Sequence, residues 1–429
     1  MVLFMKNLIQ ISVFVFLFFS CKTTEKQSSD STKKQATDKA VVASSVVYVE
    51  SIASKFVSKD SSTLTVFMKI TMQKSNQAEV KIQEFVSRFT LNYVMYPDFA
   101  SRERLAYANV PLDLQKVVRV ATNQFVIRFD IKKPANIQAA ILLSEVAEIG
   151  TGKKSQEQLN LRFKSNKLSD KVALFDQNGT APLMRNYVNV NDTVLVTDLN
   201  KTAKKLYLYY YSHTFDAATS PMNLASRAST KTLTIDTIMT VVIGRPMTFK
   251  NEGLYFILED TTDTYGIGIV VTNKRFPKMT LPKELTEPVM YVSQNQEIVE
   301  LLNTKQPKKA LDRYWLSLAN GNPETARRNI KVYYDRVEEA NRLFTSYKEG
   351  WKTDKGMIYI VMGAPDRVTR GKDREIWVYS QRANFSEVNF TFNRRQNQFV
   401  DDHYELQRYV EYQPIWYPMV EAWRSGNNN

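Results

Sequence analysis

The sequence predicts a mixed β and α+β fold, with two tandem antiparallel β-sandwich modules, immunoglobulin-like in strand spacing, followed by a C-terminal α+β domain. Hydrophobic residues alternate with a period close to two from about residue 46 to residue 273, in runs rich in β-branched and aromatic side chains. Beyond Pro282 the apolar residues recur three and four positions apart, as on one face of a helix. The chain has 429 residues, which is enough for two or three packed domains.

The predicted boundaries follow these changes of pattern. We assign residues 1–20 to a signal peptide and 21–44 to a flexible tether. Residues 45–165 and 166–275 form the two sandwich modules, and residues 276–429 form the α+β domain.

The N-terminus has the pattern of a secretory targeting segment. Lys6 precedes an almost uninterrupted apolar run from Leu8 to Phe19, which is shorter than the ~20 residues needed to span a bilayer. Cys21, the single cysteine, follows that run and Ser20, and the segment resembles the lipobox of bacterial lipoproteins. We therefore expect Cys21 to carry lipid, palmitate included, and to anchor the protein in the outer membrane. The alternative is an ordinary secreted protein with an incidental cysteine.

The tether and the overall charge bear on partners. Residues 22–40 are mostly Lys, Ser, Thr, Gln and Asp, a composition that cannot bury a core. The net charge of +14 favours, outside the cytoplasm, an anionic membrane surface or an acidic envelope protein rather than nucleic acid. A generally basic, solvated surface is the alternative. No acidic run follows Lys22, which favours the periplasmic face over the cell surface.

Composition excludes several kinds of site. One cysteine allows no internal disulfide and no multi-cysteine metal centre, and only His213 and His403 are available to histidine-based chemistry. The run Asp401-Asp402-His403 does not suit a metal, because adjacent residues of a strand face opposite sides. No nucleotide or zinc signature is present, so we expect no metal and no cofactor.

The period-two segments give the predicted strands. The first module contains residues 64–70, 85–96, 117–120, 125–131, 137–146 and 159–163, and the second contains 206–211, 254–258 and 267–271. Turn residues from Asp260 to Gly266 predict a hairpin between the last two strands.

The α+β domain begins with helical patterns. Residues 296–302 and 308–318 are predicted helices, and Asn322-Pro323-Glu324 predicts the start of a longer one. Gly350 is expected to end that helix in a left-handed conformation.

A motif begins at this glycine and reads Gly350-Trp351-Lys352-Thr353-Asp354-Lys355-Gly356. Together with residues 314–315, 333–341, 375–379 and 390–392 it resembles the GWxTD-domain family, lipoproteins of Gram-negative bacteria. We place the resemblance from Val289 to Tyr409. It implies an envelope location and β-rich N-terminal modules, and it implies no established reaction.

The motif favours a structural role. Asp354-Lys355-Gly356 is expected to form a turn, with Gly356 at positive φ, before a strand from Met357 to Val361. The residues expected to fix this helix-to-strand crossing are Gly350, Trp351, Thr353, Asp354, Gly356, Gly363, Pro365 and Asp366. As a catalytic pair, Asp354 and Asp366 would lie ~17 Å apart at the ends of that strand. Carboxylate-pair hydrolysis needs about 5–9.5 Å.

Aromatic residues gather near the C-terminus, between Pro414 and Pro418 and on either side of them. They are Tyr404, Tyr409, Tyr412, Trp416, Tyr417 and Trp423. We expect a non-helical segment that docks either along its own domain or on a partner.

These features predict a non-catalytic, outer-membrane-anchored lipoprotein that acts as a subunit or accessory factor of an envelope complex. Outer-membrane protein assembly, secretion and surface transport are the candidate processes. The alternatives are a lipoprotein that binds glycan or peptide, and a hydrolase centred on Asp354, Asp366 or His403.

Overall fold

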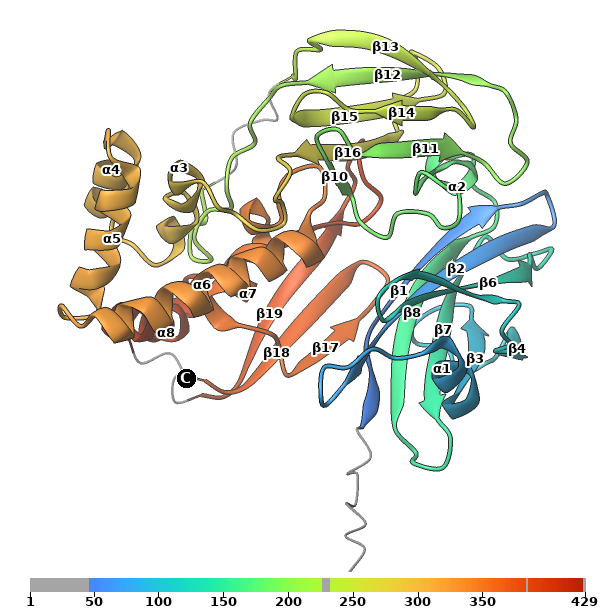
Figure 1. The fold of residues 1–429 in the computed structure, drawn as a ribbon, viewed down its shortest axis with the longest axis horizontal. Helices are drawn as coiled ribbons and strands as arrows, with labels where there is room; N and C mark the ends of the chain where they lie inside the picture. Colours follow the sequence, from blue (N-terminus) through green and yellow to red (C-terminus); the bar gives the residue numbers. More distant parts are fainter. Residues whose placement is uncertain (1–45, 226–231, 383–384, 427–429) are drawn as a thin grey trace, which may run out of the picture. The chain divides into compact units, whose positions relative to one another are not determined.

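The computed structural model describes residues 46–225, 232–382 and 385–426, and the chain beyond residue 44 forms one compact unit (Figure 1). The predicted signal peptide, Cys21 and the tether lie outside the described residues. In the described part, no helix is long and apolar enough to cross a membrane.

The first module is a sandwich of two four-stranded antiparallel sheets, as predicted. In order, one sheet contains β1 (Val47–Ser58), β2 (Thr63–Lys74), β6 (Gln124–Lys132) and β5 (Val117–Ala121). The other contains β4 (Ala106–Val110), β3 (Phe89–Tyr96), β7 (Ala139–Glu148) and β8 (Lys154–Arg162). Side chains from both sheets, among them Met68, Phe125 and Leu91, form one buried cluster.

One predicted strand of this module, residues 85–96, is wrong in its first four residues. Helix α1 (Ile82–Arg88) precedes β3, so the strand begins at Phe89 rather than at Phe85. Phe85 and Phe89 are four positions apart, and their rings stack 5.7 Å apart in the core. A spacing of four positions suits one face of a helix. The aromatic residues of this segment instead favour a strand, so the sequence predicts a strand there.

The second module pairs a five-stranded sheet with a three-stranded one. The larger contains β10 (Tyr187–Asn189), β16 (Ile267–Thr272), β15 (Gly253–Leu258), β12 (Lys205–Tyr211) and β13 (Thr237–Val242). The smaller contains β14 (Pro246–Thr248), β11 (Thr193–Thr197) and β9 (Ala173–Phe175), and α2 (Leu168–Lys171) precedes β9. The predicted hairpin between β15 and β16 is confirmed. The expectation of purely antiparallel strands is wrong at one pair, because β10 runs parallel to β16.

Helices and a four-stranded sheet build the C-terminal domain around one core. The helices are α3 (Pro282–Leu285), α4 (Asn295–Asn303), α5 (Pro307–Leu318), α6 (Pro323–Phe344), α7 (Asp354–Met362) and α8 (Gln413–Ser425), with short 3-10 turns η1 (Pro288–Tyr291), η2 (Gly350–Lys352) and η3 (Val410–Tyr412). The sheet runs β17 (Arg367–Arg370), β18 (Arg374–Arg382), β19 (Phe385–Arg395) and β20 (His403–Leu406). Asn322 caps α6 as predicted, since its Oδ1 accepts from the amides of Glu324 and Thr325.

Two segments of this domain differ from the prediction. Residues 357–361 belong to helix α7, because a short continuous apolar run suits a fully buried helix as well as a strand. The aromatic C-terminus forms helix α8 despite Pro418. Pro414 stands in the first turn, where its missing amide costs nothing, and Ile415, Trp416 and Trp423 turn into the core.

Candidate functional site

Thr353 starts helix α7 and joins it to the preceding turn η2. Its Oγ1 accepts a hydrogen bond from the amide of Gly356 at 3.0 Å, which makes it the N-cap of the helix. The same hydroxyl donates to the carbonyl oxygen of Gly350 at 2.7 Å. Asp354-Lys355-Gly356 is therefore the first turn of a helix and not the predicted turn before a strand.

The two motif glycines allow backbones to touch. A Cβ added at Gly350 would lie 2.0 Å from the carbonyl oxygen of Ala340, in helix α6. At Gly356 it would lie 1.9 Å from the carbonyl oxygen of Gly350. Helix α6 already ends at Phe344, so the predicted left-handed end at Gly350 is wrong, as is the positive φ predicted at Gly356. Close packing, rather than φ, requires glycine at both positions.

Trp351, which the sequence predicts to pack between the long helix and the sheet because of its size, is buried in the core of the C-terminal domain. Its amide donates to Oδ1 of Asn341 at 3.0 Å, and its carbonyl oxygen accepts from the hydroxyl of Tyr291 at 2.8 Å. These bonds fix the backbone of the motif to α6 and η1.

The carboxylate of Asp354 is 2% exposed and is bound on both oxygens. Arg408 donates from Nη2 to Oδ1 at 2.6 Å and from Nη1 to Oδ2 at 3.3 Å, and the amide of Leu406 donates to Oδ2 at 2.8 Å. The guanidinium of Arg408 also donates to the carbonyl oxygens of Thr219 and Ser220. Arg408 was not predicted, because nothing in the sequence marks a partner 54 positions away.

The other end of α7 carries the remaining motif residues. Gly363 has a φ of +84° at the end of the helix, and its carbonyl oxygen accepts from the hydroxyl of Tyr379 at 2.9 Å. Pro365 follows, half-buried, and Asp366 accepts from the amide of Ser380 at 2.7 Å.

The carboxylates of Asp354 and Asp366 are kept apart. Asp354 is the first of the nine residues of helix α7, and Asp366 lies beyond its last. At about 1.5 Å per residue, the two ends of this helix are about 12 Å apart. Each is held by its own partners, so the structure does not bring them together as a pair.

Neither histidine joins them. His403 Nε2 lies 3.3 Å from Oε1 of Glu405, while its neighbours Asp401 and Asp402 lie in the loop before β20, not on a strand as predicted, and bind other elements. His213 is exposed beside the ring of Phe215. Among the described residues, no group of His, Cys, Asp or Glu is arranged to hold a metal ion.

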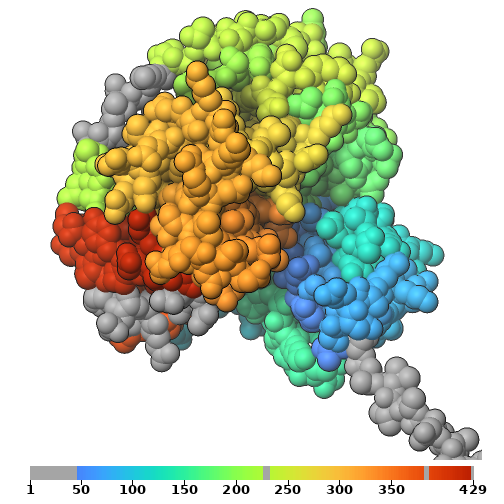
Figure 2. Space-filling view, turned by 60° about the vertical axis from the view of Figure 1, so that its left-hand side comes forward, coloured from blue at the N-terminus to red at the C-terminus, as the bar shows by residue number. Residues whose placement is uncertain are grey.

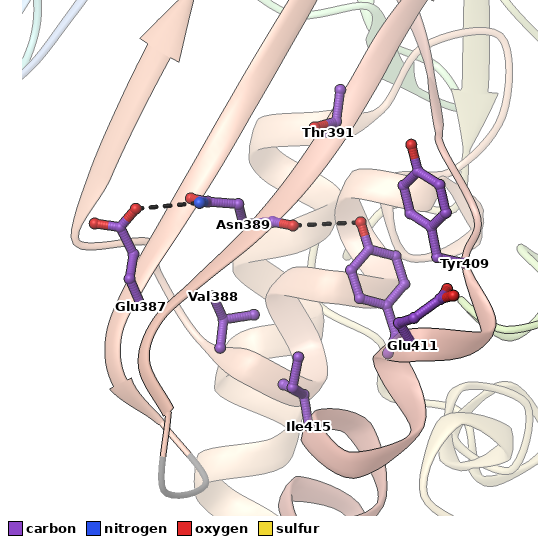
Figure 3. A pocket seen from close by; sticks show the side chains of 8 residues that line it. Glu387, Val388, Asn389, Thr391, Tyr409, Glu411 and Ile415 are labelled. Carbon is purple, nitrogen blue, oxygen red and sulfur yellow. Dashed lines mark hydrogen bonds between the residues drawn. The ribbon is translucent and has the colours of Figure 1, made fainter.

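An open hollow of about 390 Å³ lies where the chain leaves β20 and diverges from β19 (Figure 3). Its lining comprises Glu387, Val388, Asn389, Thr391, Tyr409, Glu411, Tyr412 and Ile415. The hydroxyl of Tyr412 donates to the carbonyl oxygen of Asn389, and Asn389 Nδ2 donates to Glu387. The hollow therefore combines polar groups with the ring of Tyr409, which is 41% exposed.

Comparison with known families identifies this part of the chain. Residues 253–425 match the model of the GWxTD domain. This region is a GWxTD domain. The match begins before the predicted Val289, at strand β15 of the second sandwich.

Other comparisons add no function. No curated protein matches the chain. Among solved structures, a crystal structure of β-glucuronidase from Parabacteroides merdae is similar over 33% of this chain and 16% of its own, at 12% identity and a TM-score of 0.18. The chain thus covers less than a fifth of that enzyme's length, and so low a TM-score establishes no shared fold.

Lys355, within the motif, forms a largely buried ion pair with Glu375. Lys355 Nζ lies 3.1 Å from Oε2 of Glu375 and 3.8 Å from the ring centre of Tyr404. Burial lowers the pKa of Lys355, and the carboxylate of Glu375 partly opposes that shift. Trp377 Nε1 donates to the other carboxylate oxygen of Glu375 at 2.6 Å. The rings of Trp377 and Tyr404 therefore both border the ion pair.

Most aromatics of the C-terminal cluster pack inside the GWxTD domain. Tyr412, Trp416 and Trp423 are buried, and Trp423 Nε1 donates to the carbonyl oxygen of Val361 in α7. Tyr409 and Tyr417 are exposed. Intramolecular packing is therefore the main role of this segment.

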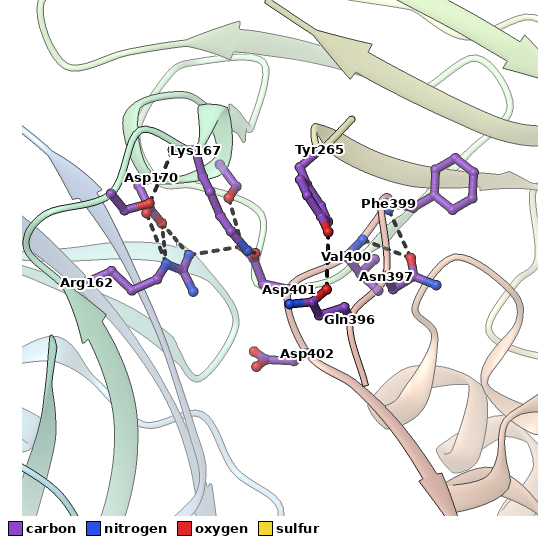
Figure 4. Close-up of polar contacts among 12 residues, drawn as sticks. Arg162, Lys167, Asp170, Tyr265, Gln396, Asn397, Phe399, Val400, Asp401 and Asp402 are labelled. Carbon is purple, nitrogen blue, oxygen red and sulfur yellow. Dashed lines mark hydrogen bonds and ion pairs between the residues drawn. The ribbon is translucent and has the colours of Figure 1, made fainter. Parts of the chain in front are cut away.

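The loop between β19 and β20, residues 396–402, contacts both sandwich modules, and we call it the clasp (Figure 4). Phe399 packs edge-on against Phe256 of β15, with ring centres 4.8 Å apart. The amide of Gly268 in β16 donates to the carbonyl oxygen of Phe399 at 2.7 Å. The clasp thus extends the core of the second module.

Asp401 joins the clasp to Arg162 of the first module and to two residues at the start of the second. Its carboxylate accepts from Arg162 at 2.9 Å, Lys167 at 2.6 Å and Ser169 at 2.7 Å. Burial alone would raise the pKa of Asp401, but these partners outweigh it and hold the pKa below its ordinary value. Arg162 also pairs with the buried Asp170. The carboxylates of Asp170 and Asp401 therefore both oppose the positive charge of its guanidinium.

Proposed function

We propose that the protein is a non-catalytic lipoprotein of the Gram-negative envelope, anchored in the outer membrane through lipid, palmitate included, on Cys21. It acts as a subunit or accessory factor of an envelope complex that assembles outer-membrane proteins, secretes proteins or transports molecules at the surface. The body faces the periplasm.

The observation that carries this proposal is the state of the motif's carboxylate. Asp354 is buried and bound by Arg408 and the Leu406 amide, so no substrate reaches it without breaking the domain. Next to it, the hydroxyl of Thr353 is bound to the backbone of Gly350 and Gly356. The backbone of Trp351 is bound to the side chains of Tyr291 and Asn341. A motif whose polar groups are bound within its own domain supports a structural role, in which the protein contacts its partners through its outer surface.

The test is co-purification from intact envelopes. Tagged full-length protein, extracted in a mild detergent, is expected to bring down outer-membrane proteins in stoichiometric amount and to incorporate labelled palmitate. A Cys21→Ser variant is the control, and it should lose both the label and the membrane fraction. A lipidated protein that purifies alone as a monomer would contradict the proposal.

A glycan- or peptide-binding role is the second candidate, and the hollow of Figure 3 favours it. Tyr409 offers an exposed ring beside the polar side chains of Asn389 and Thr391. Saturable binding of envelope glycan fragments or peptides, lost in Tyr409→Ala and kept in the exposed control Tyr417→Ala, would support it. A hydrolase is the least favoured alternative, since Asp354, Asp366 and His403 each bind different partners.

A further inference from the structure

Helices α4 and α5 form a hairpin whose connecting loop is residues 304–306, within the helical surface coloured orange in Figure 2. Leu301 of α4 is buried in the core of the GWxTD domain. Val299 and Leu302 lie outside it and are 57% and 53% exposed. Because residues three apart share one face of a helix, these two side chains form a small apolar patch at the end of α4.

Positive charge surrounds the loop that follows this patch. Four cations, Lys305, Lys308, Lys309 and Arg313, occur within nine positions. They outnumber the two carboxylates of residues 299–313, Asp312 and the exposed Glu300. The ion pairs found nearby in the described chain join other residues, such as Arg327 with Glu324 and Arg424 with Glu297. Lys309 and Arg313 also line an open hollow of about 400 Å³ together with Gln306 and Asp312.

We propose that this hairpin tip, residues 299–313, is a docking surface for an anionic lipid bilayer. Lipid phosphates complement the cations, and the boundary between headgroups and acyl chains takes up the exposed Val299 and Leu302. A nucleic acid would neutralise the same cations but would leave the apolar patch in water. The contact is additional to the anchor proposed at Cys21 and does not rest on it.

The first test uses residues 21–429 with Cys21→Ser, which carries no lipid. The buried clusters of the described residues all lie beyond residue 46, so this chain retains its cores. It is expected to sediment with vesicles of phosphatidylglycerol and phosphatidylethanolamine and not with phosphatidylcholine alone. Lys308→Glu with Lys309→Glu should lower the partition coefficient at least tenfold, because each cation near the surface contributes about a fivefold factor.

The matched control changes the same charge elsewhere. Lys164→Glu with Lys171→Glu alters two exposed lysines of the described chain and should lower binding less than threefold, since screening confines the effect to about 10 Å. If the two double variants lose vesicle binding equally, net charge alone explains the binding and the proposal is overturned.

The second test reports insertion. Cys21 is the only cysteine, so Leu302→Cys in the Cys21→Ser chain gives a single thiol for an environment-sensitive fluorophore. Its emission should shift to the blue on anionic vesicles, while the exposed control Leu114→Cys should not shift. Absence of a shift at residue 302, or the same shift with double-stranded DNA, would overturn the assignment to a bilayer.

Discussion

Asp354 shows how a single buried charge depends on its partner. Arg408 supplies the opposing charge and two hydrogen bonds, and the carboxylate is almost inaccessible to water. An Arg408→Met variant leaves that carboxylate buried and unneutralised, so we expect the free energy of unfolding to fall by about 3–5 kcal/mol. Urea denaturation followed by circular dichroism measures the change.

The control is a variant that removes both charges. Asp354→Leu combined with Arg408→Met should be more stable than Arg408→Met alone, because no charge then remains buried without a partner. A loss below about 1 kcal/mol for Arg408→Met would mean that water reaches the carboxylate.

At Gly356 we expect the addition of a single methyl group to disrupt folding. A Cβ there would lie 1.9 Å from the carbonyl oxygen of Gly350, which belongs to rigid backbone. We expect Gly356→Ala to destabilise the domain by more than about 3 kcal/mol or to prevent soluble expression. Gly371→Ala is the control, since its nearest atom would be 3.6 Å away and its stability should change by less than about 1 kcal/mol. Thermal unfolding compares the two.

Glu157 makes stability depend on pH. Burial raises its pKa to about 7, although the positive charge of Arg370 opposes the shift. Between the ordinary value of 4.5 and about 7, the folded state therefore keeps a proton that the unfolded chain releases. The stability contributed by this residue falls as the pH rises through that window.

Replacing the side chain by its neutral amide tests this sign. Glu157→Gln should be more stable than the unaltered chain by about 1–2 kcal/mol at pH 8 and equal to it near pH 4. Urea denaturation at both pH values measures the difference. A gain that is the same at both would show that the carboxyl is neutral or ionised throughout.

At the scale of elements, the sequence predicts those whose signals are local. The alternation of residues in β6 and β7 and the Asn322 cap of α6 belong to single segments, and all three were predicted. Helix α7 was missed because its six apolar residues, Met357 to Met362, are all buried, which removes the periodicity that separates helix from strand.

The contacts of the motif were predicted less completely than its residues. Burial of Trp351 follows from its size, and the separation of Asp354 from Asp366 follows from chain length alone. The contact of Arg408 with Asp354 joins residues 54 positions apart, and that of Asn341 with Trp351 joins helix α6 to the turn that follows it. Neither was predicted, because no periodicity marks such a contact.

Thr353 provides a prediction for the whole of α7. Thr353→Ala removes the cap of the helix and the bond to Gly350, so we expect a loss of about 1–2 kcal/mol in the free energy of unfolding. Thr353→Ser keeps the hydroxyl and should lose less than half of that. Urea denaturation ranks the three proteins, and equal losses for Ala and Ser would show that the methyl group, rather than the cap, matters.

At the scale of the whole molecule, the clasp unites parts that the sequence pattern separates. Phe399 belongs to the core of the second sandwich, and Asp401 binds Arg162, at the end of the last strand of the first. The clasp itself lies between two strands of the GWxTD domain. A short loop therefore couples three predicted modules, and their predicted boundaries at residues 165 and 275 stay predictions.

This coupling predicts how the protein unfolds. If the clasp makes the described body cooperative, Asp401→Ala with Phe399→Ala should divide a single calorimetric transition into at least two, because Arg162 and Lys167 lose a shared acceptor and Phe256 loses its packing partner. Asp402→Ala is the control within the same loop: its carboxylate is 69% exposed and pairs only with Arg394 among the described contacts, so it should leave the transition single. A double variant that still unfolds in one transition, with the melting temperature of the control, would show that the modules are coupled elsewhere.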